Sequence, residues 1–127
     1  MYKELVISII LVILIVIGDL ITQNYTKKNV SFFTSELEIL KQSLINKDSK
    51  TAQEEAEKIS NKWEQVHEKL AYYIEHDELE KVETDFTACK SFINTGNYDL
   101  AMSELDKTVF VLEHITDKYS FNLQNIF

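Results

Sequence analysis

Two hydrophobic patterns run along this chain, and the first is a continuous apolar segment near the amino end. From Leu5 to Ile21 the sequence is apolar throughout, except at Ser8, Gly18 and Asp19. A helix rises about 1.5 Å per residue, so the segment covers roughly 25 Å, close to the hydrocarbon thickness of a bilayer. The pattern predicts one membrane-spanning helix over residues 5–21, with Asp19 in its last turn, near the lipid headgroups.

Three interpretations of this segment compete. A cleavable signal peptide would need a small-x-small pattern after the apolar run, and Gly18-Asp19-Leu20-Ile21 does not supply one. A buried core helix would need a soluble domain large enough to surround a helix that is apolar on every face. We favour the third interpretation, an uncleaved single-span anchor. The short tail that contains Lys3 favours a cytoplasmic amino end and an exported remainder.

The second pattern consists of four amphipathic stripes. Hydrophobic residues recur three and four positions apart over residues 33–44, 52–73, 79–93 and 98–119, which is the spacing of one face of an α-helix. The absence of Pro and the presence of only two Gly favour long helices. The predicted fold class is all-α, with an N-terminal transmembrane helix followed by an antiparallel bundle of three to four amphipathic helices.

Polar segments between the stripes predict where the helices end. Residues 46–49 separate the first two stripes, and Gly96 is suited to the C′ position after the third. Between the second and third stripes the register slips near residue 76. We expect either a junction with Asp77 as N-cap and Glu80 three residues on, or a continuous but kinked helix.

The expected organisation is an anchor and juxtamembrane segment over residues 1–28 and a helical bundle domain over residues 29–127. No strong helix breaker lies between Thr22 and Phe32, so the membrane helix is expected to continue into the first bundle helix. Residues 44–56 and 93–105 echo each other, which two packed helical hairpins would explain. The turn at Gly96 also resembles that of a tetratricopeptide repeat, although an array would need about three copies.

Charge and composition exclude several classes of function. From residue 29 onward, 10 Lys and 19 Asp or Glu give a net charge of −9, which argues against binding to nucleic acid or anionic lipid headgroups. The chain has no Arg, the usual residue for bidentate phosphate recognition. Its single Cys, Cys89, lies on a predicted core stripe and is expected to be a buried hydrophobe rather than a redox site.

Candidate catalytic chemistry is sparse. Glu64-Gln65-Val66-His67 matches the Glu-x-x-His motif of di-iron bundles, but such a site needs a second copy and the other two His lack one. No Gly-flanked nucleophilic Ser or glycine-rich phosphate loop is present. We therefore expect no enzyme activity, no catalytic residues, no bound metal and no cofactor.

Five residues remain as candidates for interaction or sensing. His76, next to the acidic residues Asp77 and Glu78, could respond to protons or cations, although a solvated helix junction explains the cluster equally simply. Trp63 could line a pocket between helices, although core packing is the commoner role. Phe127 ends an apolar carboxyl-terminal tail that could pack on the bundle or engage a partner.

The order of these features resembles a family of small bacterial proteins of unknown function. The features are an apolar amino-terminal span, Trp63, the segment Tyr73-Ile74-Glu75-His76-Asp77-Glu78-Leu79, and a second hairpin that ends in Asn125-Ile126-Phe127. The resemblance covers nearly the whole chain. It implies a single-span helical protein of clostridia-like, spore-forming Gram-positive bacteria. It also implies that larger multi-span membrane proteins are companions of such chains.

The favoured function is that of a non-enzymatic, membrane-anchored bundle that interacts with another membrane or envelope protein. Residues 5–21 would contact the bilayer, and the bundle would lie outside the cytoplasm, with homo-oligomer formation left open. The alternative is an extracytoplasmic sensor or ligand-binding bundle that responds to pH or a small ligand. A hydrolase or metalloenzyme is the least favoured hypothesis.

Overall fold

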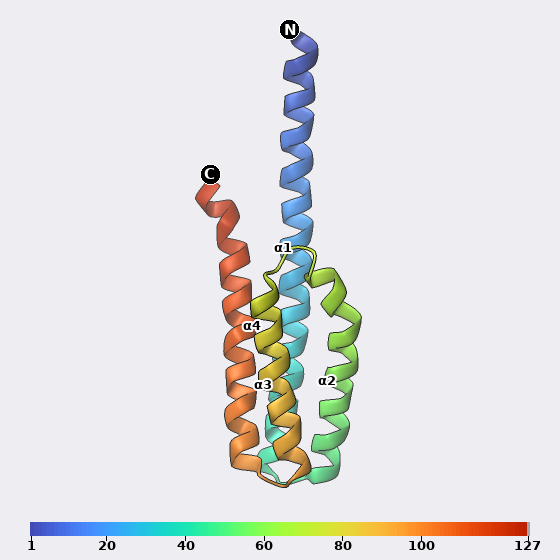
Figure 1. Cartoon of the computed structure of the whole chain (residues 1–127), viewed down its shortest axis with the longest axis vertical. Coiled ribbons are helices and arrows are strands. Elements are labelled where there is room, and N and C mark those ends of the chain that lie inside the picture. Colours follow the sequence, from blue (N-terminus) through green and yellow to red (C-terminus); the bar gives the residue numbers. More distant parts are fainter. Residues whose placement is uncertain (127) are drawn as a thin grey trace.

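The computed structural model describes residues 1–126, with side chains described as far as Tyr119. In this part of the chain there are four helices and no strand. They are α1 (Tyr2–Ile45), α2 (Ser49–Leu70), α3 (His76–Asn94) and α4 (Tyr98–Ile126). Figure 1 shows them running alternately in opposite directions, with the amino-terminal end of α1 projecting beyond the other three and α4 reaching further along α1 than the α2–α3 loop does. The predicted all-α fold is confirmed.

Helix α1 consists of two halves with opposite surroundings. In the first half, the apolar side chains of residues 5–21 are exposed except for the half-buried Val16, and none of its most apolar stretch is buried. In the second half, the side chains of Phe33, Leu37, Leu40 and Leu44 are almost fully buried. The expected continuation of the apolar helix into the bundle is confirmed. A long apolar helix in this position is consistent with a signal anchor or a signal sequence.

The four stripes form the core. Most of the residues predicted to lie on them are buried, including Phe33 and Phe86, whereas the stripe residues Trp63, Tyr73, Tyr98 and Tyr119 are partly buried against the core. Cys89 is fully buried, and burial raises the pKa of its thiol to about 12. A thiol held in its neutral form behaves as a small hydrophobe, as expected.

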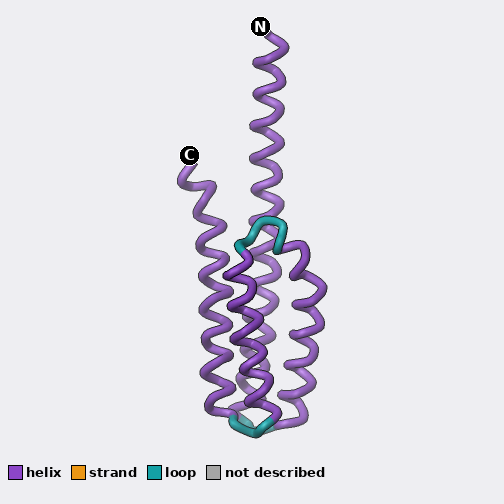
Figure 2. Tube along the Cα trace, viewed as in Figure 1, coloured by secondary structure: helices purple, strands orange, loops and turns teal. Residues whose placement is uncertain are grey.

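The bundle consists of two equivalent hairpins, α1–α2 and α3–α4. In the first turn, Asp48 N donates to Ser43 O at 3.0 Å and Lys47 N donates to Leu44 O at 3.1 Å. In the second turn the corresponding amides, of Asn97 and Gly96, donate to Phe92 O at 2.8 Å and to Ile93 O at 3.1 Å. This is the Schellman pattern of helix ends. Figure 2 shows both turns at one end of the bundle and the α2–α3 loop at the other.

The two turns fix which positions of the hairpins correspond. Aligning Asp48 with Asn97 gives residues 27–70 of the first hairpin counterparts in residues 76–119 of the second at the same sequence offset, which we call the repeat offset. This is the offset at which residues 44–56 echo residues 93–105. The expected pair of packed helical hairpins is therefore present.

The α2–α3 junction is a true break, but the predicted cap is wrong. Helix α3 begins at His76 with Glu75 in the N-cap position, so Asp77 lies inside the first turn. The loop between the helices is anchored by Ile74, which is 3 % exposed, and by the Glu75 amide, which donates to Tyr119 Oη at 2.9 Å. These tertiary contacts start the helix earlier than predicted. Asp77 still favours it, because acidic residues stabilise a helix amino end.

Candidate functional site

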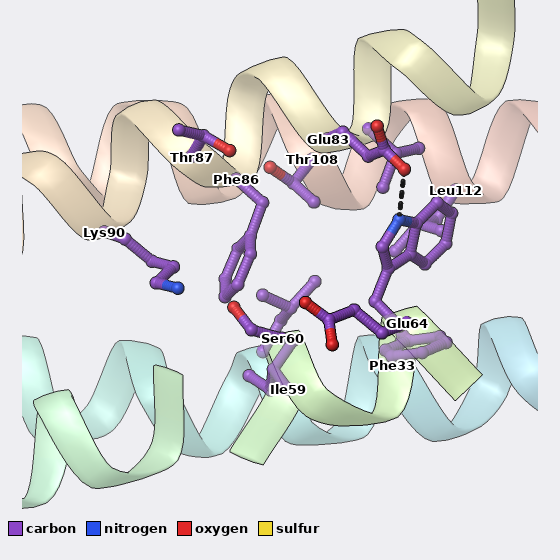
Figure 3. A pocket seen from close by; sticks show the side chains of 13 residues that line it. Phe33, Ile59, Ser60, Glu64, Glu83, Phe86, Thr87, Lys90, Thr108 and Leu112 are labelled. Atoms are coloured by element: carbon purple, nitrogen blue, oxygen red, sulfur yellow. Dashed lines mark hydrogen bonds between the residues drawn. The ribbon is translucent and has the colours of Figure 1, made fainter. Parts of the chain in front are cut away.

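A cleft of about 330 Å³ lies between α2 and α3, and we call it the Trp63 cleft. Its mouth is formed by Ser60, Trp63, Glu64, Glu83, Thr87 and Lys90, and its floor by apolar residues of all four helices and Thr108. Figure 3 shows Phe86 reaching from α3 toward Ser60 and Ile59 of α2, with Glu64 beside them. The small side chains of Ser60 and Thr87 leave room where the two helices face each other.

The cleft exists because the two interfaces between the hairpins are packed unequally. The repeat offset makes the α1–α4 and α3–α2 interfaces equivalent, yet α2 packs against α3 much less extensively than α4 packs against α1. Equivalent ion pairs cross both interfaces. Lys41 Nζ lies 3.1 Å from Asp106 Oδ1 across the closed interface, and Lys90 Nζ lies 3.8 Å from Glu57 Oε2 across the open one.

Trp63 is held at the cleft by a polar network. Its Nε1 donates to Glu83 Oε1 at 2.9 Å, the bond drawn as a dashed line in Figure 3. The same oxygen lies 3.1 Å from His67 Nε2. The indole also packs edge-on against Phe33, with ring centroids 5.5 Å apart. Glu83 therefore sets the orientation of the indole from the opposite wall of the cleft.

A pair of carboxyl groups joins the helices of the first hairpin. Burial, together with hydrogen bonding to Glu36, raises the pKa of Glu55 to about 7. The bond from Glu55 and the nearby Lys58 ammonium, 3.2 Å from Glu36 Oε2, lower the pKa of Glu36. Opposite shifts of this kind indicate two carboxyl groups that share one proton across the α1–α2 interface.

The second hairpin holds a related pair at the equivalent positions. Asp85 and Glu104 are the counterparts of Glu36 and Glu55, and burial, followed by the charge of Glu104, raises the pKa of Asp85. Lys107, the counterpart of Lys58, lies with its Nζ 3.1 Å from Glu104 Oε1, whereas Lys58 pairs with Glu36, the counterpart of Asp85. Each hairpin therefore carries two acids and an exposed Lys at equivalent sequence positions, but the Lys pairs with a different acid in each.

A third polar cluster lies where α3 begins. Lys118 Nζ is 3.3 Å from Glu75 Oε1 and 3.2 Å from Glu78 Oε1, and the bonds to Glu78 and Glu75 raise the pKa of Lys118. His114 Nε2 lies 3.6 Å from the same Glu78 oxygen. His76 points to solvent with 82 % of its side chain exposed, and its acidic neighbour is Glu80 at 3.5 Å.

The candidates from the sequence therefore lie in different places. Trp63 lines the cleft, whereas His76, Asp77 and Glu78 lie at the start of α3 and are not among the residues that line it. Phe127 lies outside the described residues. Up to Tyr119, no group of three or more His, Cys, Asp or Glu side chains is arranged to hold a metal ion. His67 contacts Glu83 and not Glu64, its partner in the Glu-x-x-His motif.

Sequence reasoning missed Glu83 and both carboxyl pairs. All of these residues are acidic positions beside a hydrophobic stripe, where the usual expectation is a solvated face. The signal that could have found the pairs is the repeat offset, which matches Glu36 with Asp85 and Glu55 with Glu104.

Comparison with known proteins identifies the family. A family model described as a domain of unknown function (DUF4363) matches residues 20–126, which is most of the chain. The protein belongs to this family. No curated protein and no solved structure matches it. The resemblance to a family of unknown function is confirmed at this level.

Proposed function

We propose that this chain is a membrane-anchored, non-enzymatic helical bundle that binds another membrane or envelope protein from outside the cytoplasm. The observation that carries the proposal is the unbroken helix α1, which joins an exposed apolar half to a packed half. An exposed apolar surface of this length promotes aggregation in water and is stable in lipid.

Contacts just after the apolar segment support a permanent anchor over a cleaved signal. A signal peptide is released by cutting the chain close to the end of its apolar run. Here that region is helical and bonded to the bundle: Tyr73 Oη lies 2.6 Å from Thr26 Oγ1 and donates to Thr22 O at 3.3 Å. Asp19 accepts from Gln23 Nε2 at 2.8 Å, which links the last turn of the apolar segment to the turn that follows.

The α2–α3 loop would lie at the membrane surface in this arrangement. Tyr73 fastens the loop to α1 only a few residues beyond the apolar segment. Its neighbour Tyr72 is 89 % exposed. A Tyr at this level suits the interfacial region, where aromatic residues with a polar tip are enriched.

Exposed apolar side chains on the bundle support a protein partner. Phe110 on α4 is 69 % exposed and lies beside a shallow hollow lined by Lys81, Asp85 and Lys107. An aromatic side chain with charged residues around it is the usual composition of a contact patch. The same patch could accept a second copy of this chain.

Site-specific photocrosslinking in intact cells tests the partnership. Benzoylphenylalanine placed at Tyr72 or Phe110 should crosslink to a membrane protein, whereas the same group at the exposed Gln53, at the other end of the bundle, should not. Mass determination of the mature chain tests the anchor, because an uncleaved protein retains residues 1–21. A chain that is released from membranes by alkaline carbonate, or that yields no crosslink from either position, would contradict the proposal.

A second candidate function is sensing of pH, and the shared proton of Glu36 and Glu55 supports it. The pKa of Glu55 at about 7 places its ionisation in the physiological range. Ionisation would put two adjacent negative charges between α1 and α2, next to one Lys. The pH dependence of stability described in the Discussion tests this candidate.

A further inference from the structure

We propose that the Trp63 cleft binds a small organic cation, with an apolar body in the cleft and an ammonium group beside Glu64 and Glu83. The inference goes beyond the proposed anchoring and partner binding and depends on neither. It rests on the shape of the cleft, on the residues that distinguish it from the equivalent closed interface, and on charge.

The cleft is a specific departure from the symmetry of the bundle. Its counterpart, the α1–α4 interface, is packed more extensively and has the shorter Lys41–Asp106 ion pair. The hollow of about 250 Å³ in that interface lies near residues 20–27, almost entirely before the part that the repeat offset covers. Two positions account for much of the chemical difference. Trp63 corresponds to Leu112, and Glu83 corresponds to Thr34, so the open interface has an indole and a carboxylate where the closed one has a Leu and a Thr.

The size and lining of the cleft suit a small ligand. A volume of about 330 Å³ falls at the lower end of the range for ligand pockets, roughly 300–1,000 Å³. Phe33 is 2 % exposed and Phe86 is 8 % exposed, so both supply a dry apolar wall. Trp63 adds an indole fixed through its N–H, and indole faces are the best aromatic partners for cations.

Charge at the cleft favours a cation over an anion. Among the described residues Glu64 has no ion-pair or hydrogen-bond partner, and Figure 3 shows it beside the open part of the cleft. One oxygen of Glu83 holds Trp63 and His67, which leaves the other to accept from a ligand. The one cation of the lining, Lys90, lies within ion-pair range of Glu57. The net charge of the chain, −8, also attracts cations.

Fluorescence of Trp63, the single Trp, reports binding directly. The full chain in lipid nanodiscs is titrated with 2-phenylethylamine, with neutral 2-phenylethanol and with anionic 3-phenylpropionate. We expect saturable binding of the amine with a dissociation constant on the order of 0.1–1 mM, as suits a ligand of about nine heavy atoms. The alcohol and the acid should bind at least about tenfold more weakly, a difference of about 1.4 kcal/mol.

The second hairpin supplies a matched control variant. Glu64→Gln should weaken the amine at least about fivefold and leave the alcohol unchanged, because only the amine forms an ion pair with the carboxylate. Glu113→Gln, at the equivalent exposed position of α4, should change neither. Circular dichroism shows that each variant is folded.

Four results would overturn the proposal. They are the absence of saturable binding up to about 20 mM, equal affinity for amine and alcohol, tighter binding of the acid, and unchanged amine affinity in Glu64→Gln. Benzoylphenylalanine in place of Ser60 would also report on a protein ligand. If it crosslinks to another protein while the amine does not bind, the cleft holds a protein segment and the proposal is wrong.

Discussion

The two hairpins use the same backbone device with different residues, and the difference shows where the bundle can vary. Both turns have equivalent hydrogen bonds, and both place one residue at positive φ. In the second turn that residue is Gly96, at φ 74°, and in the first it is Lys47, at φ 55°. A left-handed conformation costs a non-Gly residue roughly 1–2 kcal/mol, so the first turn stores strain that the second avoids.

The first turn compensates with a stronger cap. Asp48 accepts from Thr51 N at 3.2 Å and from Thr51 Oγ1 at 2.7 Å, whereas Asn97 accepts a single long bond of 3.4 Å from Leu100 N. Packing differs between the hairpins as well, because α3 and α4 contact each other more extensively than α1 and α2 do. The second hairpin is the better-packed support, and the looser α2 carries the Trp63 cleft.

The largest expected effect comes from truncating a core residue of one hairpin and its counterpart in the other. Leu40 and Cys89 occupy equivalent positions, and both are fully buried. Leu40→Ala leaves a cavity and should lower the free energy of unfolding by about 2–5 kcal/mol. Cys89→Ala removes a single sulfur atom and should cost roughly 1 kcal/mol. Urea unfolding of the full chain in detergent, followed by circular dichroism, measures both. Equal losses would contradict the argument that the size of the cavity sets the cost.

Exchanging the residues of the two turns should reverse their difference. Lys47→Gly relieves the left-handed strain and should stabilise the fold by about 1 kcal/mol, while Gly96→Lys introduces it and should destabilise by roughly 1–2 kcal/mol. Space does not limit the second change, because a Cβ at Gly96 would meet nothing within 4 Å. Thermal unfolding measures both shifts, with Lys50→Gly near the start of α2 as a control that should destabilise. A loss of stability in Lys47→Gly would refute the strain argument.

The Glu36–Glu55 pair of the first hairpin should make stability depend more strongly on pH than the Asp85–Glu104 pair of the second hairpin does. A raised pKa means that the fold favours the protonated acid, so the stability from Glu55 is complete below about 4.5, its ordinary pKa, and is lost as pH rises through about 7. The lowered pKa of Glu36 has the opposite effect: the fold favours its ionised form, so the stability from Glu36 is present above about 4.5, its ordinary pKa, and is lost on acidification. Glu55→Gln keeps a donor for Glu36 without the charge. At pH 8 it should stabilise the fold by on the order of 1 kcal/mol, and the decline of stability above pH 5 should flatten.

The equivalent change in the second hairpin provides the comparison. Asp85→Asn should act in the same direction, because burial and the charge of Glu104 raise the pKa of Asp85. Its effect should be smaller, because two ammonium groups, of Lys81 and Lys107, oppose the rise in the pKa of Asp85, whereas only Lys58 opposes that of Glu55. Chemical unfolding at a series of pH values measures both variants. If the free energy of unfolding of the wild-type protein is constant from pH 5 to 8, Glu36 and Glu55 do not share a proton. The second candidate function, pH sensing, would then be wrong as well.

Much of the fold could be predicted because helical periodicity is a local property. The stripes that contain Leu40, Leu79 and Leu105 are buried as their spacing indicates, and Gly96 takes the expected left-handed position. The N-cap of α3 could not be predicted in the same way. It depends on the loop contacts of Ile74 and Tyr119, which come from segments far apart along the chain.

The candidate site was only half predictable for the same reason. Trp63 stands out as the single Trp, but its partner Glu83 is one of many acidic residues in the sequence. Which of them meets Trp63 depends on how α2 lies against α3. The same holds for Glu55, whose shifted pKa comes from its burial and from Glu36 of a different helix.

The sequence by itself determined the apolar helix, the four stripes, the turns and the family of this protein, because each depends on residues close together along the chain. Tertiary structure alone decided that one interface between the hairpins closes while its equivalent stays open. Helices of similar pattern can pack at several distances, and the choice depends on side chains from all four helices at once. Ser60 and Thr87 are small where α2 faces α3, and that space became the cleft in which Trp63 lies.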